Sequence, residues 1–431
     1  MGSVHAELHA RRPHPRYAST LPLKGGGVSQ ITREKIVVGA SKTETGGGPI
    51  RYGMVGGGQG AFIGAVHRIA ARIDNEFVLV AGALSSNPER AKASAAELGL
   101  DPARSYGSYA EMAQAEAKRP DGIEVVAIVT PNNVHVPAAK AFLEAGIHVI
   151  CDKPLATTLA EAKKLAALVE KTGKVFVLTH NYTAYPMVRQ AREMVAKGQL
   201  GDIRIVQSEY PQDWLTEDLA ATGQKQAAWR SDPKQAGAGG ALGDIGTHAY
   251  NLARFVSGLE LDSLSADLDA FVPGRLLDDN INVLLRFKPV GGSHSAKGMI
   301  WASQVAPGHE NGLKLRIYGS KGGLEWVQAD PNYLWYTPFG QPKQLITRNG
   351  AGALPVAGRV SRVPPGHPEG YLEGFANIYQ EAARAIRAAR RKGGKPAKDV
   401  VFPTVQDGVE GMAFIEACVK SAKKNGAWTK L

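Results

Sequence analysis

The sequence lacks two features, and each absence narrows the classes of protein to which it can belong. The 431 residues contain no apolar run long enough for a membrane span, which takes about 18 residues, so we expect no membrane partner. The two cysteines, Cys151 and Cys418, are too few for a disulfide framework or a Cys-rich zinc site. We therefore expect a reduced, cytoplasmic protein without a metal centre.

An excess of basic residues is present, but it is confined to two segments. Of the formal charge of +11, residues 1–50 contribute +4 and residues 384–398 contribute +7, so the rest of the chain is neutral. Basic charge in a terminal segment and at one helix end is more typical of a solvated surface than of a binding groove. With no nucleic-acid motif beside it, this pattern predicts no nucleic-acid partner.

The composition, 44% hydrophobic and 21% charged, is that of a globular protein, and the length suggests two or three domains. Residues 1–49 are rich in Gly, Pro, Ser and charge, which predicts a flexible N-terminal arm. An arm that packs on a partner subunit or over a cofactor is the alternative.

Residues 50–180 alternate between short apolar runs and helical patterns. We expect strands at 52–55, 77–81, 124–129, 147–151 and 175–178, with helices between them at 87–98, 135–145 and 159–171. This alternation predicts a doubly wound parallel sheet with helices around it.

Residues 181–431 have a different character. After a helix at 187–197, apolar strands at 203–209, 261–271, 281–287, 297–304, 313–318 and 324–328 follow one another mostly without intervening helices. This pattern predicts a second α/β domain with a large, mostly antiparallel open sheet. A helix near 240–255 and two late helices, 371–391 and 405–424, should pack against one of the two domains.

A glycine-rich turn joins the first strand to the first helix. Gly56, Gly58 and Gly60 let the backbone approach a pyrophosphate, whose charge the helix N-terminus stabilises. A plain tight turn is the alternative, and either Ala61 or Gly64 could take the role of the third glycine of a dinucleotide turn.

The end of the second strand bears on the choice between the two nicotinamide cofactors. A site specific for NAD usually has Asp or Glu there, whereas this chain has Ser85, with Arg90 five residues later. A hydroxyl and a cation suit a 2′-phosphate, which favours NADP over NAD. Helix capping by Ser86 or Asn87 is the alternative and is compatible with it.

Three further groups of residues suggest catalysis. The loops in the stretches 130–135 and 145–154 lie at carboxyl ends of predicted strands, where open α/β sheets bind ligands, and the second carries Lys153. If the segment 240–255 is helical, Asp244 and His248 lie on one face, where the carboxylate could orient the imidazole and raise its proton affinity. That pair would form a general acid/base. A surface lysine and a structural helix start are the alternatives.

These motifs, in this order, resemble the Gfo/Idh/MocA family of oxidoreductases, the relatives of glucose–fructose oxidoreductase and inositol dehydrogenase. The resemblance covers about residues 50–425 and includes His67 after the glycine turn. It implies an N-terminal Rossmann domain at 50–180 and a C-terminal substrate-binding and oligomerisation domain at 181–431. The family usually has Glu before the lysine, where this chain has Asp152.

The resemblance assigns roles to individual residues. The family's catalytic trio falls on Lys153, Asp244 and His248. The substrate cleft is then lined by the trio together with Asn181, Tyr182, Trp229 and Arg230. The cofactor-binding set is Gly56, Gly58, Gln59, Gly60, Ala61, Ser85, Arg90, Thr130, Pro131, Asn132, His135, Asp152 and Lys153.

The combined interpretation is an NAD(P)-dependent oxidoreductase that transfers a hydride between nicotinamide and a secondary alcohol or ketone of a sugar, glycoside or polyol. Likeness to the family also implies a homodimer or homotetramer. One alternative is a glycoside hydrolase or lyase that keeps NAD bound through transient oxidation and elimination. A second is a non-catalytic protein that senses dinucleotide, which would not need the three catalytic residues together.

Overall fold

The computed structural model describes residues 48–219, 222, 224–290, 294–391 and 393–431. The arm expected at 1–49 therefore lies outside the described residues, apart from its last two positions. No helix within the described residues is long and apolar enough to cross a membrane.

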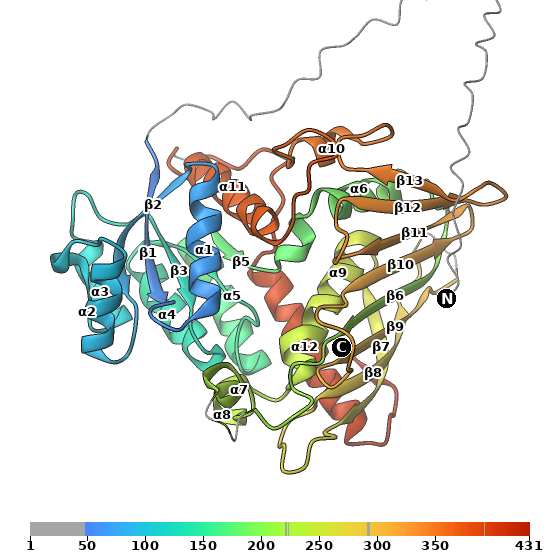
Figure 1. Cartoon of the computed structure of the whole chain (residues 1–431), viewed down its shortest axis with the longest axis horizontal. Coiled ribbons are helices and arrows are strands. Elements are labelled where there is room, and N and C mark those ends of the chain that lie inside the picture. The colour runs from blue at the N-terminus through green and yellow to red at the C-terminus, as the bar shows by residue number, and fades with distance from the viewer. Residues whose placement is uncertain (1–47, 220–221, 223, 291–293, 392) are drawn as a thin grey trace, which may run out of the picture. The chain divides into compact units, whose positions relative to one another are not determined.

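A five-stranded parallel sheet forms the first half of the described chain (Figure 1), with strand order β2-β1-β3-β4-β5. Its strands are rich in Val and Ile and are largely buried, as a parallel sheet covered on both faces requires. The strands are β1 (Ile50–Gly56), β2 (Phe77–Ala83), β3 (Val125–Val129), β4 (His148–Cys151) and β5 (Phe176–Leu178).

Short helices connect these strands, and polar side chains begin several of them. Asn87, Ser108 and Thr158 each accept a hydrogen bond from a backbone N–H in the first turn of α2, α3 and α5. The helices are α1 (Phe62–Ile73), α2 (Pro88–Glu97), η1 (Pro102–Arg104), α3 (Tyr109–Glu116), α4 (Asn132–Glu144) and α5 (Leu159–Thr172).

A nine-stranded sheet of order β13-β12-β11-β10-β6-β9-β8-β7-β14 forms the second half. Only β6 and β9 pair in parallel; the other pairs are antiparallel. Its strands are β6 (Ile203–Pro211), β7 (Leu261–Asp269), β8 (Asn280–Phe287), β9 (Lys297–Ser303), β10 (Lys314–Gly319), β11 (Gly322–Val327), β12 (Tyr333–Pro338), β13 (Gln344–Thr347) and β14 (Thr429–Lys430). These two sheets confirm the predicted fold class, although the sequence analysis missed β12, β13 and β14.

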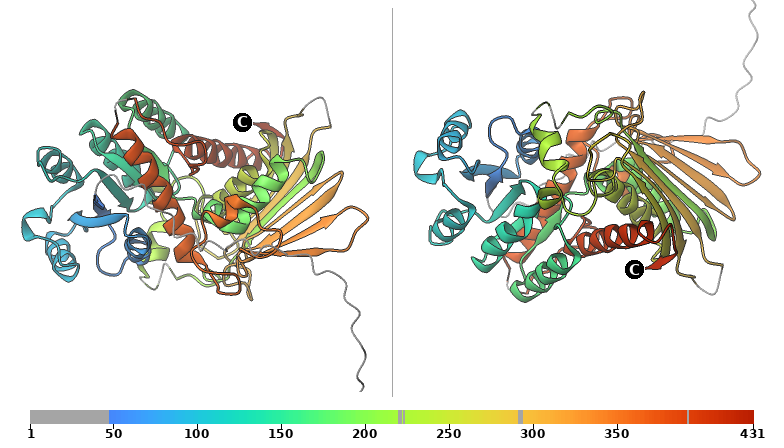
Figure 2. Two further views of the ribbon diagram at one scale, coloured as in Figure 1. Left: turned by 90° about the horizontal axis from the view of Figure 1, so that it is seen from above. Right: turned by 90° about the horizontal axis from the view of Figure 1, so that it is seen from below.

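Helices cover one face of the large sheet (Figure 2). Those of the second half are η2 (Asn181–Ala184), α6 (Pro186–Ala196), α7 (Lys225–Arg230), α8 (Pro233–Ala236), η3 (Leu242–Gly246), α9 (Thr247–Ser257), α10 (Pro355–Gly358), α11 (Tyr371–Ala389) and α12 (Val405–Ala422). Between α6 and the sheet, Trp326 is buried and its ring packs against Tyr185.

The two late helices join the halves of the described chain. Helix α11 packs along α1, and α12 lies between α5 and β7. A buried ion pair connects α6 to α11, because Arg189 Nη1 lies 3.3 Å from Glu381 Oε1 and both side chains are almost inaccessible. These contacts hold the parallel sheet against the C-terminal domain and so shape the cavity between them.

Candidate active site

A cavity of about 970 Å³ lies at the carboxyl ends of the parallel strands and extends to the large sheet. It is the location in which open α/β sheets bind ligands. Seventeen of the predicted site residues line it: Gly56, Gly58, Gln59, Ala61, Ser85, Arg90, Thr130, Pro131, Asn132, Asp152, Lys153, Asn181, Tyr182, Trp229, Arg230, Asp244 and His248.

Two predicted cofactor residues do not line this cavity. Gly60 lies on the turn with φ of +73° and borders a smaller hollow behind it. His135 is buried and holds two loops together: its Nδ1 lies 2.7 Å from the carbonyl oxygen of Pro154, and its Nε2 lies 2.9 Å from that of Thr130. His135 therefore connects the loop that follows Lys153 to the end of β3 and does not border this cavity.

The glycine turn has no room for side chains where it meets its neighbours. A Cβ on Gly58 would lie 2.7 Å from the carbonyl oxygen of Leu84, and one on Gly64 would lie 2.4 Å from the Cα of Gly57. Gly64 therefore provides the close contact between helix and turn. Ala61 ends the turn and begins α1, where no side chain caps the first backbone N–H groups. Open N–H groups at a helix start suit a phosphate.

Unpaired polar atoms are a second sign that this cavity holds a polar ligand. Within the described residues, the hydroxyl of Thr130 and the side-chain nitrogen of Asn181 are buried and have no hydrogen-bond partner. Leaving such groups unsatisfied costs about 1–3 kcal/mol each. The turn, the open helix start and these atoms together fit a dinucleotide that extends from Ser85 to Lys153.

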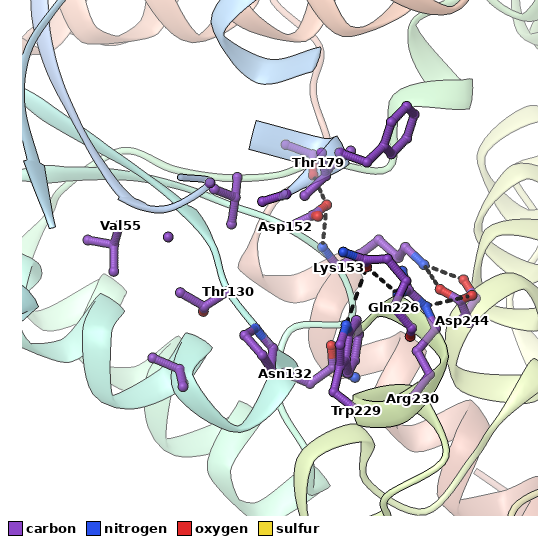
Figure 3. A pocket seen from close by; sticks show the side chains of 18 of the residues that line it. Val55, Thr130, Asn132, Asp152, Lys153, Thr179, Gln226, Trp229, Arg230 and Asp244 are labelled. Carbon is purple, nitrogen blue, oxygen red and sulfur yellow. Dashed lines mark hydrogen bonds and ion pairs between the residues drawn. The ribbon is translucent and has the colours of Figure 1, made fainter. Parts of the chain in front are cut away.

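Asp244 is the centre of the polar cluster at the far end of the cavity (Figure 3). Lys153 Nζ lies 3.0 Å from its Oδ1, and Arg230 Nε lies 3.1 Å from its Oδ2. Lys153 also donates to the backbone carbonyl of Asp244, and Gln304 donates to Oδ2 at 2.9 Å. Burial alone would raise the pKa of Asp244, but the charges of Arg230 and Lys153 outweigh it and hold that pKa well below its ordinary value.

The loop after β4 presents Lys153 to this cluster. Asp152, the residue before it, accepts hydrogen bonds on Oδ1 from the backbone N–H of Lys153 at 3.0 Å and from the Thr179 hydroxyl at 2.7 Å. The lysine side chain is only 12% exposed. The backbone N–H of Lys153 is held by Asp152, and the carbonyl oxygen of the next residue, Pro154, is held by His135. The enclosed lysine side chain therefore points into the cavity rather than into solvent.

His248 has surroundings that the sequence analysis did not foresee. We expect Asp244 to orient the imidazole and raise its proton affinity. Its charge does raise the pKa of His248, although burial outweighs this effect, and no hydrogen bond joins the two side chains among the described residues. The Nδ1 of His248 lies 3.4 Å from the Nδ1 of His180, and its ring meets the ring of Tyr182 edge-on at 4.8 Å. Burial, with the nearby charge of Lys153, lowers the pKa of His248 well below its ordinary value.

The backbone explains why the expected Asp–His pair does not form. The segment 242–246 is a π-helix rather than an α-helix, so Asp244 and His248 do not have the stacked i, i+4 relation of an α-helix. Asp278 fixes the start of this segment, since its carboxylate accepts hydrogen bonds from the backbone N–H groups of Gly240 at 2.9 Å and Leu242 at 2.7 Å. π-Helical turns are frequent at functional sites.

Several cavity residues were not predicted from the sequence. They come from strand ends, loops and the helices α7 and α11 of the second domain, where no motif spacing marks them. They are Tyr210, Gln212, Trp214, Gln226, Asn311, Gln328, Tyr371 and Phe375.

Comparison with known proteins places the chain in a family. Residues 50–180 match the family described as "Oxidoreductase family, NAD-binding Rossmann fold", and residues 188–325 match the one described as "GFO/IDH/MocA C-terminal domain". The oxidoreductase YfiI of Bacillus subtilis is 39% identical over 89% of this chain and 97% of its own length. Levoglucosan dehydrogenase of Pseudarthrobacter phenanthrenivorans is 31% identical over 64% of this chain and 73% of its own length.

Solved structures give the same result. An oxidoreductase from Sinorhizobium meliloti is 63% identical, with a TM-score of 0.82, over 89% of this chain and all of the other. An inositol dehydrogenase homologue from Azotobacter vinelandii, complexed with NAD⁺, is 38% identical with a TM-score of 0.85 over 89% of this chain and 98% of the other. An inositol dehydrogenase homologue from the same organism, 36% identical with a TM-score of 0.82 over 89% of this chain and 98% of the other, has been solved with NADH and myo-inositol. The chain therefore belongs to the Gfo/Idh/MocA family of NAD-binding oxidoreductases.

Proposed function

We propose that the chain is a dehydrogenase or reductase that transfers a hydride between NAD(P) and a secondary alcohol or ketone of a sugar, glycoside or polyol. The observation that carries this proposal is the convergence of Lys153, Asp244 and His248 at one end of a cavity shaped for a dinucleotide. In this arrangement residues 50–180 bind the cofactor and residues 181–431 provide the substrate end.

The three residues divide the chemistry of alcohol oxidation among them. The nicotinamide, when bound, accepts the hydride. Lys153 holds the reacting oxygen and stabilises negative charge that develops on it. His248, kept neutral by burial, takes the hydroxyl proton in the oxidation direction and returns it in reduction. Asp244 fixes the Lys153 ammonium group and is held in turn by Arg230 and Gln304.

The relatives support the substrate class. Levoglucosan dehydrogenase is named for an anhydrosugar, and the Azotobacter homologue has been solved with myo-inositol. Both are neutral cyclic compounds with several hydroxyl groups. We therefore propose a neutral cyclic compound with several hydroxyl groups as the substrate class of this chain, and neither individual compound as its substrate.

The test is to incubate the protein with NAD⁺ or NADP⁺ and a panel of pyranoses, glycosides and inositols, following the absorbance of reduced nicotinamide. Turnover of any member supports the proposal. If no panel member changes the absorbance but denaturation releases dinucleotide, the result would instead favour the hydrolase or lyase with a tightly bound cofactor. Failure to bind any dinucleotide would contradict both.

We further propose that the cofactor end favours NADP(H). The only carboxylates among the described residues that line the cavity are Asp152 and Asp244, both at the nicotinamide end, whereas Ser85 and Arg90 border the other end. No acidic group there competes with a 2′-phosphate. The NAD⁺ and NADH found in solved relatives make NAD(H) the second candidate.

Substitution of Ser85 and Arg90 separates these two candidates. We expect Ser85→Asp to weaken NADP⁺ binding by about 30-fold or more, because like charges repel, while NAD⁺ binding changes less or improves. Arg90→Gln should weaken NADP⁺ alone, by about tenfold. Both effects are measured by isothermal titration calorimetry with each oxidised dinucleotide. Equal losses for the two cofactors would contradict the assignment.

The uncovered face of the large sheet supports a proposal of self-association. Strand register places Ile205, Leu284, Met299, Tyr318 and Trp335 on the same face, and each side chain is at least 37% exposed. Helices α6, α9 and α12 cover the opposite face (Figure 2). We propose that a second copy covers this apolar face, which gives a homodimer or homotetramer.

Charge on this face should therefore dissociate the oligomer. Leu284 and Met299 are direct cross-strand neighbours, so we expect Leu284→Glu with Met299→Glu to lower the sedimenting mass at concentrations where the unchanged protein is oligomeric. Leu276→Glu, at a loop position that is 76% exposed, is the control. A monomeric unchanged protein would contradict this proposal and leave the proposed chemistry untouched.

A further inference from the structure

A chain of uncharged hydrogen-bonding groups lines the substrate end of the cavity. It consists of Tyr182, Tyr210, Gln212, Asn311 and Gln328, which we name the Asn311 network. Its members come from η2, from β6 and the residues after it, from the loop before β10 and from the end of β11. Members that are hydrogen-bonded to each other lie up to 101 residues apart in sequence. None belongs to a motif that the proposed mechanism uses, apart from the substrate-cleft residue Tyr182.

The hydrogen bonds of this network have one possible direction. Asn311 Oδ1 is an acceptor only, so the Tyr210 hydroxyl donates to it at 2.7 Å and Gln212 Nε2 donates to it at 2.8 Å. These two bonds fill both lone pairs of the amide oxygen. Because the Tyr210 proton is already engaged, Tyr182 donates to the Tyr210 oxygen at 2.6 Å.

The direction of these hydrogen bonds determines which donors and acceptors of the network remain available to a substrate. Asn311 Nδ2 uses one N–H to donate to Gln328 Oε1 at 2.8 Å, and Gln212 uses one of its two on Asn311. Gln212 therefore keeps one N–H that has no partner among the described residues, and the second N–H of Asn311 is directed to the Tyr182 hydroxyl oxygen. That hydroxyl, whose proton is committed to Tyr210, has a second lone pair left to accept from a substrate hydroxyl. Its ring contacts His248, so this acceptor lies next to the proposed reaction centre.

Cations and carboxylates are equal in number at this end of the cavity. The two cations that line it, Lys153 and Arg230, are both paired with Asp244, the second carboxylate, Asp152, lines the same cavity, and the network itself is neutral. A carboxylate or phosphate on the substrate would lose its hydration without gaining a free cation among the described residues, which is costly. Hydroxyl groups, in contrast, can satisfy the open N–H of Gln212 and the Tyr182 oxygen.

We propose that Asn311 is a specificity-determining residue: through its network it recognises ring hydroxyls away from the reacting carbon and rejects analogues that lack one or carry an anionic group there. This inference rests on the proposed oxidoreductase function and adds to it the residue that selects the substrate. A site that hydrogen-bonds a substrate hydroxyl discriminates strongly against the analogue without it, because its own polar groups are then left unpaired.

The experiment compares the full-length protein with Asn311→Leu on matched probes. The probes are myo-inositol and its monodeoxy analogues, and glucose with its monodeoxy analogues and glucuronate. For the unchanged protein we expect kcat/KM to fall by about 30-fold or more for at least one deoxy analogue. The discrimination ratio is kcat/KM for the parent compound divided by kcat/KM for its deoxy analogue. In Asn311→Leu we expect this ratio to fall below about threefold. The kcat for the deoxy analogue should stay within about fivefold of its value in the unchanged protein.

The ratio of kcat/KM for parent and analogue distinguishes a role in specificity from a structural role. A merely structural role for Asn311 would lower kcat/KM for parent and analogue alike and leave the ratio as it is in the unchanged protein, which would overturn the inference. Gln341→Leu, at an exposed turn position, is the control and should leave every rate unchanged. Should Asn311→Leu fail to fold, Asn311→Asp provides the same test. It keeps acceptors for Tyr210 and Gln212 but cannot donate to Gln328, so it should also lower the ratio.

Binding separates failure of this inference from failure of the proposed function. The same probes are titrated into protein loaded with NADPH, and separately with NADH, and followed by tryptophan fluorescence, since Trp214 donates to Gln212 at 3.1 Å. Absence of turnover in the unchanged protein would contradict the proposed function, while the ratio of dissociation constants would still test Asn311. Unchanged binding ratios in Asn311→Leu, or no binding of any probe, would overturn the inference.

Discussion

Lys153→Met is expected to lower kcat/KM by about a thousandfold or more while dinucleotide binding stays within a few-fold of that of the unchanged protein. Methionine keeps the length and apolar stem of lysine but removes the ammonium group that faces the reacting oxygen. The loss corresponds to about 4 kcal/mol of transition-state stabilisation. Steady-state kinetics on whichever panel substrate is turned over, together with dinucleotide titration, measures both quantities.

The structure indicates that this variant should fold. Asp244 loses its contact with Lys153 but keeps Arg230 at 3.1 Å and Gln304 at 2.9 Å, so no buried carboxylate is left without a partner. Lys197→Met is a matched control: this lysine is 51% exposed and pairs only with Glu193, one helical turn away. Full activity in Lys153→Met would rule out a catalytic role for the lysine, and equal losses in the two variants would indicate a non-specific effect.

The sequence predicts the scaffold of this site well because the scaffold depends on local patterns. Buried parallel strands appear as continuous apolar runs, and polar caps such as Ser108 and Thr158 begin helices between them. The second sheet was harder to predict. The strands β12 and β13 lie at one edge and carry exposed Trp335 and Leu345 on the uncovered face, so they lack the alternation of apolar and polar residues that marks a half-buried strand.

The candidate site was also difficult to predict, because contacts between distant segments leave no local sequence pattern. Lys153 and Asp244 lie 91 positions apart in sequence, and family resemblance rather than spacing brought them together. The contact of Asp244 with Gln304 and most of the Asn311 network depend on how strands of the second sheet end, which a local pattern does not encode. The expected Asp244–His248 pair failed for a related reason, because an i, i+4 spacing implies contact only in an α-helix, and this segment is a π-helix.

His248→Gln is expected to lower kcat by about a hundredfold to ten-thousandfold, with KM changing by only a few-fold. Glutamine is polar and of similar size but cannot exchange a proton with a substrate hydroxyl near neutral pH. His367→Gln, at an exposed loop position, is the control and should leave kcat unchanged. Activity of His248→Gln equal to that of the unchanged protein would exclude His248 as the acid/base.

The pH profile of the unchanged protein gives a second, independent test of His248. Burial, with the charges of Lys153 and His180, lowers the pKa of His248, and only the charge of Asp244 opposes them; His180 itself has its pKa lowered to about 3 by burial. A base with a lowered pKa is already deprotonated at neutral pH. In the oxidation direction, kcat/KM should therefore stay level as the pH falls from about 8 to below the ordinary histidine pKa of about 6.5.

One neighbouring group could imitate a histidine in this profile, and it can be removed separately. Burial raises the pKa of Asp278 to about 6, against the effect of its backbone hydrogen bonds, and this carboxylate fixes the start of the segment that carries His248. A fall in rate near pH 6 that disappears in Asp278→Asn would belong to the positioning carboxylate. A fall near pH 6.5 that persists in Asp278→Asn would contradict a buried, neutral His248 as the base, because protonation would then occur on an imidazole with ordinary proton affinity.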